Sequence, residues 1–343
     1  MPAGHRAVSV LYQAFLTGLV LTLVTRRGED QAAEFVFRLF RRQHLEKFQP
    51  GLAKLGLDRL PHAVACAQYH YLSNQLGGVK TEYARESDRK AWVRYPPPRW
   101  IWYGASICGI PSRVNAAMLH GWHGHNGVTL GNPRLGFVCA GQTVDGHPGL
   151  EGYYLEHERD LAPDERVRFA PGETMPAFDP STAPRLDPVD WPPERLEAVV
   201  ARYSMEYVRT TLPVALELLG PVDTRALLGH AARLIGMQLH DETARLLEIE
   251  GRGPEPFARY LAALARAQGE TVEVEAGSGR ASVRLRGWRL ARGLEPLDPA
   301  AFEAWCELWR GALAAHDRRL RLEAAREPGG DVVFHIAPAP AGP

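Results

Sequence analysis

Residues 271–287, "TVEVEAGSGRASVRLRG", decide the fold class of this chain of 343 residues. Apolar and polar side chains alternate along both arms of the stretch, and "GSG" at residues 277–279 separates the arms. Alternation with a period of two is typical of a half-buried strand, and a glycine-rich break between two such arms predicts an antiparallel hairpin. Residues 319–325 and 331–336, the latter preceded by "PGG", predict a second hairpin. Segments of helical periodicity surround the hairpins, so we expect an α+β fold.

The same series of segments occurs twice along the chain, at an offset of about 190 to 195 residues. The matching pairs are residues 7–15 with 198–207, 37–48 with 230–243, 89–95 with 279–285, and 111–122 with 298–316. The first helix of each copy ends near a glycine, Gly28 or Gly220. We therefore predict a tandem duplication of a helix-helix-hairpin-helix-hairpin unit, in which helices cover one face of each small antiparallel sheet.

The segment between the two copies has the composition of a linker. Residues 161–193 are rich in proline and acidic residues and show no periodicity, which is typical of a linker or a wrapping segment. Proline in the first turn of "PPERLEAVV" then predicts the start of a helix. We expect a first repeat over residues 1–160, which bears the site, and a second over residues 194–343, which serves as scaffold.

The charge balance and the cysteines limit the partners and the compartment. Lys+Arg and Asp+Glu each number 40, so no excess of positive charge is available for nucleic acid or an anionic membrane. The four cysteines are scattered without a CxxC pair, which favours reduced thiols in a cytoplasmic protein.

Residues 7–25, "AVSVLYQAFLTGLVLTLVT", carry no charge and are nearly long enough to cross a bilayer. Their counterpart in the second copy, residues 195–219, contains Arg202, Glu206, Arg209 and Glu217. We therefore interpret residues 7–25 as a soluble helix with a more completely covered face, and expect no membrane partner. A homodimer is one way to cover part of this surface.

The strongest candidate site is "MLHGWHGHNG", residues 118–127, because the second copy has Cys306 and Trp309 opposite His120 and His123. His120 and His123 are three residues apart on a helix, and Gly124 lets His125 fold back. Convergent imidazoles suit a divalent metal, zinc or similar, with His44, His70 or Glu82 as a further ligand. Acid–base or substrate contacts without a metal, and a purely structural turn, are the alternatives.

Other residues of the first copy are candidates for contact with a substrate. Glu82 and His70 are possible proton shuttles, although Glu82 also fits a solvated strand position. Arg94 is a candidate clamp for a substrate carboxylate. The aromatic residues around "YPPPRWIWYG", Trp100 and Tyr103 above all, either wall a pocket or cover the edge of the core. Asn126 completes the set of predicted substrate-binding residues.

The second copy, from about residue 220 to 337, resembles the L-2-amino-thiazoline-4-carboxylic acid hydrolase-like family. The resemblance lies in "LGHAARLIGMQLHDETARLLEIEGRGPEPFARYLAALARAQGETVEVE", "RASVRLRG", "FEAWCELWRGALAAHDRRLRLEAA" and "DVVFHI". Of the family's motif residues, the second copy keeps Cys306. The first copy has His120 and His123 where the family has a cysteine and an aspartate. It also has Asn132-Pro133 near the family's asparagine-proline, and Pro96 to Pro98 in place of the family's cysteine-proline. The resemblance implies a small α+β fold that encloses a small polar molecule, and hydrolytic opening of a carbon–nitrogen bond.

These observations together predict a cytoplasmic hydrolase that acts on a C–N bond of an amidine, an amide or a small heterocycle. In this hypothesis His120, His123 and His125 hold the metal, and its bound water attacks the substrate. The alternative is a non-catalytic protein that binds or senses a small molecule.

Overall fold

The computed structural model describes residues 1–294 and 296–340, with the side chain of residue 201 left aside. Its contacts divide the chain into two compact units. One, here the C-terminal unit, comprises Met1–Thr22 and Glu197–Pro343, and the other, the N-terminal unit, comprises Leu23–Leu196. Each unit packs helices on a small sheet, so the predicted α+β fold class is confirmed.

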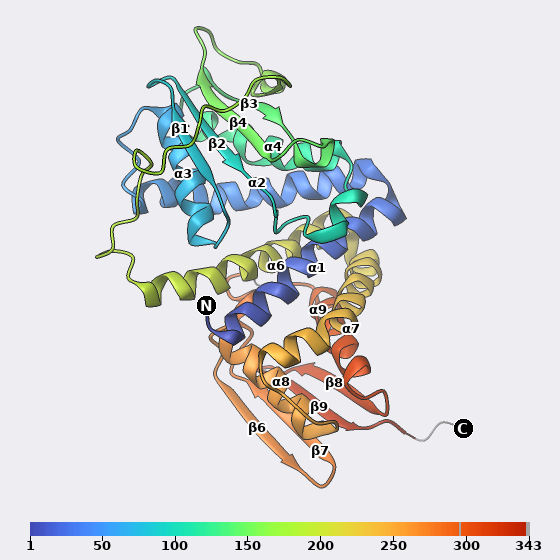
Figure 1. Ribbon diagram of the computed structural model, residues 1–343. Coiled ribbons are helices and arrows are strands. Elements are labelled where there is room, and N and C mark those ends of the chain that lie inside the picture. The colour runs from blue at the N-terminus through green and yellow to red at the C-terminus, as the bar shows by residue number, and fades with distance from the viewer. Residues whose placement is uncertain (295, 341–343) are drawn as a thin grey trace. The chain divides into compact units, whose positions relative to one another are not determined.

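The N-terminal unit contains a mixed sheet with strand order β1-β2-β4-β3-β5, in which only the short β5 runs parallel to its neighbour within the described residues (Figure 1). Its strands are β1 Glu82–Arg85, β2 Lys90–Tyr95, β3 Leu135–Gly141, β4 Leu150–Glu156 and β5 Val167–Phe169. Its helices are α2 Glu29–Lys54, α3 His62–Leu76, α4 Ser112–Gly121 and α5 Asn126–Thr129, with 3-10 turns η1 Gly104–Gly109, η2 His123–His125, η3 Thr143–Asp145 and η4 Pro163–Glu165.

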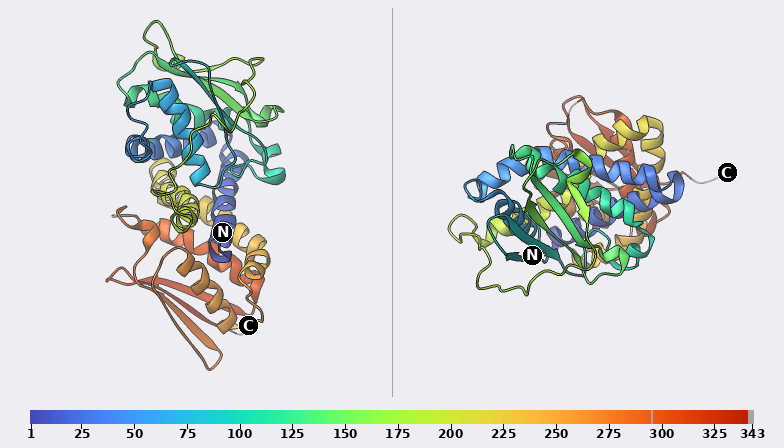
Figure 2. Two further views of the ribbon diagram at one scale, coloured as in Figure 1. Left: turned by 60° about the vertical axis from the view of Figure 1, so that its left-hand side comes forward. Right: turned by 90° about the horizontal axis from the view of Figure 1, so that it is seen from above.

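The C-terminal unit contains an antiparallel sheet with strand order β6-β7-β9-β8, and α8 lies along one of its faces (Figures 1 and 2). Both hairpins predicted from the alternating pattern are confirmed: β6 Val272–Gly277 pairs with β7 Arg280–Leu285, and β8 Leu320–Arg326 pairs with β9 Val332–Pro338. The helical elements are most of α1 Ala3–Arg27 and of α6 Pro193–Asp223, the π-turn η5 Thr224–Leu228, α7 Gly229–Leu246, α8 Pro254–Ala267, η6 Arg289–Ala291 and α9 Pro299–His316.

The two halves of the chain share their order of elements. In each half, three long helices precede a hairpin, a fourth long helix and a second hairpin, and the first four strands of each sheet pair in the same order. Gly28 and Gly220 break the chain after the first helix with similar backbone angles, φ 88° and ψ 170° against φ 74° and ψ 170°. This agreement is what a duplication predicts, while the common origin of the halves stays a prediction.

Glycines allow the second and fourth long helices of each half to cross backbone against backbone. A Cβ atom on Gly236 of α7 would lie 1.9 Å from the Leu308 carbonyl oxygen of α9, and one on Gly311 would lie 2.1 Å from the Arg233 carbonyl oxygen. In the other half, a Cβ atom on Gly121 of α4 would lie 2.5 Å from the Phe37 carbonyl oxygen of α2. Real Cβ atoms do not come this close to a backbone oxygen, so these crossings require glycine.

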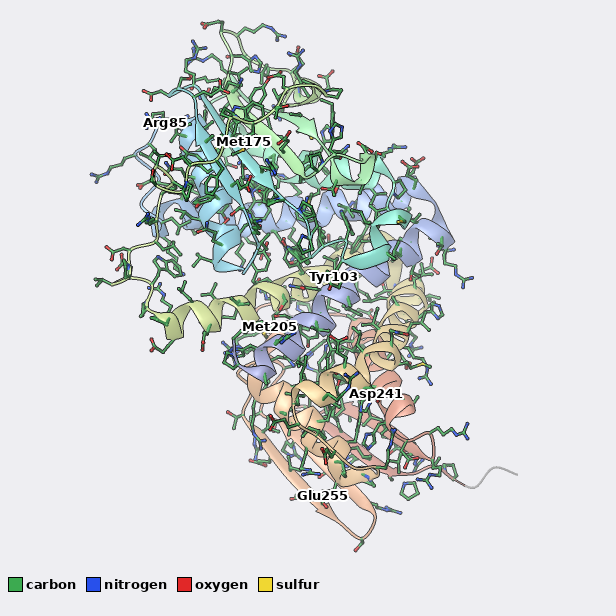
Figure 3. The ribbon with its side chains drawn as sticks, viewed as in Figure 1. Arg85, Tyr103, Met175, Met205, Asp241 and Glu255 are labelled. Atoms are coloured by element: carbon green, nitrogen blue, oxygen red, sulfur yellow. The ribbon has the colours of Figure 1, made fainter. Side chains whose placement is uncertain are left out.

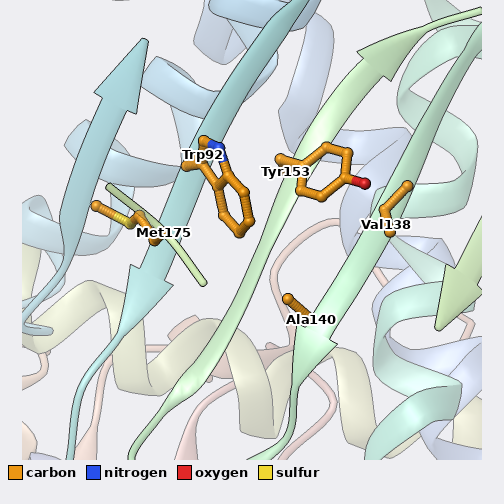
Figure 4. Close-up of a cluster of buried hydrophobic side chains, with 5 residues drawn as sticks. All are labelled: Trp92, Val138, Ala140, Tyr153 and Met175. Atoms are coloured by element: carbon orange, nitrogen blue, oxygen red, sulfur yellow. The ribbon is translucent and has the colours of Figure 1, made fainter. Parts of the chain in front are cut away.

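The proline-rich segment wraps the sheet of the N-terminal unit. β5, within the segment, pairs with β3 over residues 137–139, and Met175 joins a buried apolar cluster on the sheet (Figure 4). The other members of the cluster are Trp92, Val138, Ala140 and Tyr153. Of the two interpretations of this segment, linker or wrapping segment, the packing of β5 and Met175 on the sheet agrees with the wrapping segment.

Helix α1 contributes its first 22 residues to the C-terminal unit, which sequence reasoning had not placed there. The Tyr12 hydroxyl donates to Gln268 Oε1 at 2.7 Å and accepts from Trp305 Nε1 at 3.3 Å. Helix α1 is long and apolar enough to span a membrane, yet 61% of its most apolar window is buried inside the protein. Burial of this kind accounts for its apolar composition, although the absence of a membrane partner stays a prediction.

The close helix crossing predicts that replacing a helical glycine by alanine destabilises the protein, the opposite of the usual effect. In an open helix, replacing glycine by alanine stabilises by up to about 1 kcal/mol. We expect Gly236→Ala instead to lower the free energy of unfolding by about 2 kcal/mol or more, because the new methyl group forces α7 and α9 apart. Gly277→Ala is the control, since its Cβ meets nothing within 4 Å. Urea unfolding of both variants checks this, and equal stabilities would contradict it.

Candidate functional site

The three histidines predicted to bind a metal do not converge. His123 is buried with Nδ1 3.0 Å from the Tyr154 hydroxyl, whereas His125 Nδ1 donates to the His120 carbonyl oxygen at 2.9 Å. His120 itself lies beside the ring of Phe169. Among the described residues, no group of three or more His, Cys, Asp or Glu side chains could hold a metal ion. The structure therefore does not bring His120, His123 and His125 together as a ligand set, because α4 ends at Gly121 and a 3-10 turn follows. The binding of a metal by this protein stays a prediction.

The structure instead brings His123 together with two other predicted site residues, His70 and Asn126. Asn126 Nδ2 donates to the Tyr154 hydroxyl at 2.8 Å, and His123 Nδ1 lies 3.3 Å from His70 Nε2. Each of these four side chains is exposed by 6% or less. Sequence reasoning missed Tyr154, although the position of Tyr154 in an apolar strand was a signal. This cluster is a buried polar core whose hydrogen bonds connect α3, η2, α5 and β4.

Burial keeps the imidazoles of the core neutral. Desolvation lowers the pKa of His70 well below its ordinary value and lowers the pKa of His123 to about 3. Burial, together with the neighbouring Arg41 charge, also lowers the pKa of His44 to about 3. Desolvation raises the pKa of Tyr154 well above its usual range. The cluster is therefore a network of uncharged donors and acceptors near neutral pH.

The C-terminal unit has buried histidines of its own, which sequence comparison overlooked. The rings of His240 and His316 lie 5.2 Å apart, and both side chains are buried. Tyr260 lies beside His240 and bonds Thr243 at 2.8 Å. Buried imidazoles are thus common to both units, which weakens the inference that histidines in the first copy alone mark a chemical site.

Glu82 and Arg94 also lie together, on neighbouring strands. Glu82 faces Arg94 across β1 and β2, and Arg94 faces Glu151 across β2 and β4. Arg94 Nη1 lies 3.4 Å from Glu82 Oε2, and Nε lies 3.9 Å from Glu151 Oε2. Burial raises the pKa of Glu151, and the Arg94 charge opposes that rise. The guanidinium predicted to clamp a substrate is thus held between two carboxylates of its own sheet.

The predicted aromatic residues are spread between core and surface. Trp102 is buried and donates to Asn115 Oδ1 at 2.8 Å, whereas Trp100 is half-buried. Tyr103 is 72% exposed. Its place on the ribbon is labelled in Figure 3. This stretch therefore covers the edge of the core at Trp102 and presents Tyr103 to solvent.

An open cavity of about 620 Å³ lies elsewhere in the N-terminal unit, where sequence reasoning had placed no site. Four segments meet there: the start of α3, the turn between β1 and β2, the turn before β3, and the end of β4. Its wall is formed by Arg59, Leu60, Pro61, His62, Asp88, Arg89, Gly131, Asn132, Pro133, Arg134 and Glu156. Three arginines and a histidine against two carboxylates make this a cationic cavity.

The arginines of the cavity differ in their partners. Arg89 donates to the Glu156 carbonyl oxygen at 2.7 Å and to Glu158 at 2.5 Å. Arg134 Nη2 donates to Glu156 Oε1 at 2.7 Å. Arg59 is exposed and has no ion pair or hydrogen bond within residues 1–294 and 296–340. Arg59 is thus the uncompensated positive charge of the cavity wall.

Asn132 links the histidine of the cavity to its carboxylate. Its Nδ2 atom donates to Glu156 Oε2 at 3.0 Å and lies 3.1 Å from His62 Nδ1. Its Oδ1 atom accepts the backbone N–H of Arg134 at 3.1 Å. Asn132 is only 8% exposed, so the chain His62–Asn132–Glu156 is an ordered part of the wall. The sequence signal was "NPR", noticed only through the family resemblance.

Comparisons with known proteins gave no match to this chain. No family model, no curated protein and no solved structure matches the chain. The resemblance of the second half to the thiazoline-carboxylate hydrolase-like family therefore stays a prediction.

The neutral histidine core predicts loss of stability in acid. In the unfolded chain a histidine takes up a proton near pH 6.5, whereas His44 and His123 stay neutral in the folded protein down to about pH 3. Their contribution to stability is thus full above pH 6.5 and declines as the pH falls from there towards 3. Each such histidine adds up to about 1.4 kcal/mol per pH unit to this decline.

We expect His123→Gln to flatten the pH dependence of the free energy of unfolding between pH 7 and pH 5, because one buried titrating group is removed. His335→Gln, at an exposed strand position, is the matched control and should leave the slope unchanged. Urea unfolding at a series of pH values measures both slopes. The same slope in wild type and His123→Gln would contradict a neutral buried His123.

Proposed function

We propose that the protein binds a small molecule with a carboxylate or phosphate group in the cationic cavity of the N-terminal unit. The observation that carries the proposal is Arg59, whose charge no described side chain compensates, on the wall of a cavity large enough for a metabolite. Guanidinium groups bind carboxylates and phosphates through paired hydrogen bonds. The proposal keeps the alternative of a protein that binds a small molecule, but it places the ligand in a cavity that the sequence did not indicate.

The start of α3 supports an anionic ligand at the same place. Pro61 precedes the helix and provides no side-chain cap, and Leu60, Pro61 and His62 all line the cavity. The first N–H groups of a helix carry partial positive charge, which favours an anion near them. Arg59 and the beginning of α3 thus add their electrostatic effects on one side of the cavity.

Titration calorimetry at low ionic strength tests the proposal with succinate and inorganic phosphate as probes. We expect Arg59→Gln to weaken binding of the preferred anion about tenfold or more, the loss of one charge-assisted pair. Arg185→Gln removes an exposed arginine of the proline-rich segment and should leave affinity unchanged. A preference for succinate or for phosphate identifies the head group. Equal weakening in both variants would show a general charge effect and contradict a site at Arg59.

Hydrolysis of a carbon–nitrogen bond is a second candidate function of the same cavity. It is favoured by His62, whose imidazole lies on the cavity wall and is oriented by Asn132. An oriented imidazole can polarise a carbonyl or amidine carbon of a bound substrate. The cavity brings this group close to the anion-binding arginine, as a substrate with a carboxylate and a C–N bond would require.

A panel of carboxylate-bearing amides and amidines tests this second candidate through release of ammonia or amine. We expect turnover to fall at least a hundredfold in His62→Phe if His62 polarises the substrate, the usual scale for loss of one such group. Anion binding by Arg59 should persist in that variant. Turnover that is equal in wild type and His62→Phe would exclude His62 from the chemistry.

A further inference from the structure

The hydrogen bonds around Asn132 have a fixed direction. Its Oδ1 atom accepts the N–H of Arg134, so the other end of the amide must be the NH₂ group. That group donates to the Glu156 carboxylate at 3.0 Å. The opposite orientation would place an amide oxygen against a carboxylate oxygen and an NH₂ group against a backbone N–H, which gives two repulsive contacts.

The direction of these bonds determines the tautomer of His62. Asn132 presents an N–H group to His62 Nδ1 at 3.1 Å, so Nδ1 must be the acceptor. In the neutral ring the proton is then on Nε2. Nε2 has no partner among the described residues, and His62 lines the cavity. Asn132 thereby makes His62 a hydrogen-bond donor toward whatever occupies the cavity.

The second half of the chain shows that the turn itself does not require an amide. Asp317 occupies the equivalent turn, three residues before β8 as Asn132 is three residues before β3. Asp317 Oδ1 accepts the N–H of Arg319 at 3.1 Å, the same bond that Asn132 makes with Arg134. A side-chain oxygen is sufficient for this turn. The NH₂ group of Asn132 therefore has a separate role, directed at His62 and Glu156.

We propose that Asn132 determines the specificity of the cavity. By holding His62 in the Nε2–H form, Asn132 makes the cavity offer two donors to one head group, the Arg59 guanidinium and the His62 N–H. A carboxylate accepts at both of its oxygens, whereas an amide of the same shape accepts at only one and an ammonium group at none, so the cavity selects the carboxylate. This inference rests on the proposed anion-binding function but adds a different property, because Arg59 supplies charge and Asn132 supplies the direction of a hydrogen bond.

The double variant Asn132→Asp with Glu156→Gln tests the inference. It exchanges amide and carboxylate, so it keeps the net charge, the turn oxygen and a bond between positions 132 and 156, yet presents an acceptor to His62 Nδ1. Nitrogen-15 NMR of the imidazole should report Nε2–H in wild type and Nδ1–H in the double variant. The preference for succinate over succinamide, measured by calorimetry, should fall at least tenfold. Glu156→Gln alone leaves the Asn132 amide in place and removes one negative charge from the cavity wall, so it should keep the Nε2–H tautomer and its preference for succinate should not fall.

Each outcome decides the question. A wild-type His62 protonated at Nδ1, or a changed tautomer with an unchanged preference for succinate, overturns the inference. If wild type binds neither succinate nor phosphate, the proposed function fails and the inference fails with it. If wild type binds succinate and the double variant keeps the same selectivity, only the inference is overturned. Should the double variant not fold, Asn132→Ser keeps an oxygen for the Arg134 N–H and removes the amide. Its preference for succinate should also fall, and an undiminished preference would overturn the inference.

Discussion

The close crossing of two helices is the constraint on which the rest of each unit depends. Gly236 and Gly311 bring the backbones of α7 and α9 into contact, and Gly121 does the same for α4 against α2. At such a short separation no side chain can lie between the helices, so their relative position has little freedom. α4 and α9 also lead into the turns before β3 and β8, so a rigid crossing fixes where each turn meets its sheet. The cavity of the N-terminal unit is built around one of these turns.

The buried histidines follow from this packing more than from chemistry. His123 Nδ1 lies within hydrogen-bond distance of both His70 Nε2 and the Tyr154 hydroxyl in a buried cluster, and burial lowers the pKa values of both imidazoles. A group buried in this way binds a proton more weakly in the folded unit than in the unfolded chain, so it contributes acid sensitivity to the fold. His240 and His316 are likewise buried in the other unit, which indicates that buried imidazoles are a structural feature of both units.

Local patterns in the sequence predicted the elements well and their side-chain geometry poorly. Strand alternation and helical periodicity depend on neighbouring residues, so the hairpins near residues 271–287 and 319–336 were predictable. Convergence of His120, His123 and His125 depends instead on where α4 ends, and the backbone at Trp122 turns one residue earlier than the helical spacing assumed. The cavity could not be predicted from the sequence, because Arg59, Asn132 and Glu156 come from segments that meet only through the sheet. The place of α1 likewise depends on contacts as distant as Tyr12 with Gln268.

The two equivalent turns differ in the partners of their polar side chains. In the C-terminal unit Asp317 pairs with the guanidinium of its neighbour Arg319, and Arg252 donates to the carbonyl oxygens of Ala315 and His316. Asp317 and Arg252 thus have partners within the protein, whereas Arg318 of the same turn is exposed and has no ion pair or hydrogen bond among the described residues. In the N-terminal unit the amide of Asn132 contacts His62 and Glu156, and Arg59 has no ion pair or hydrogen bond among the described residues. Two units with the same order of elements thus differ in the side chains that their equivalent turns bring together, and the proposed ligand site lies at the turn of the first.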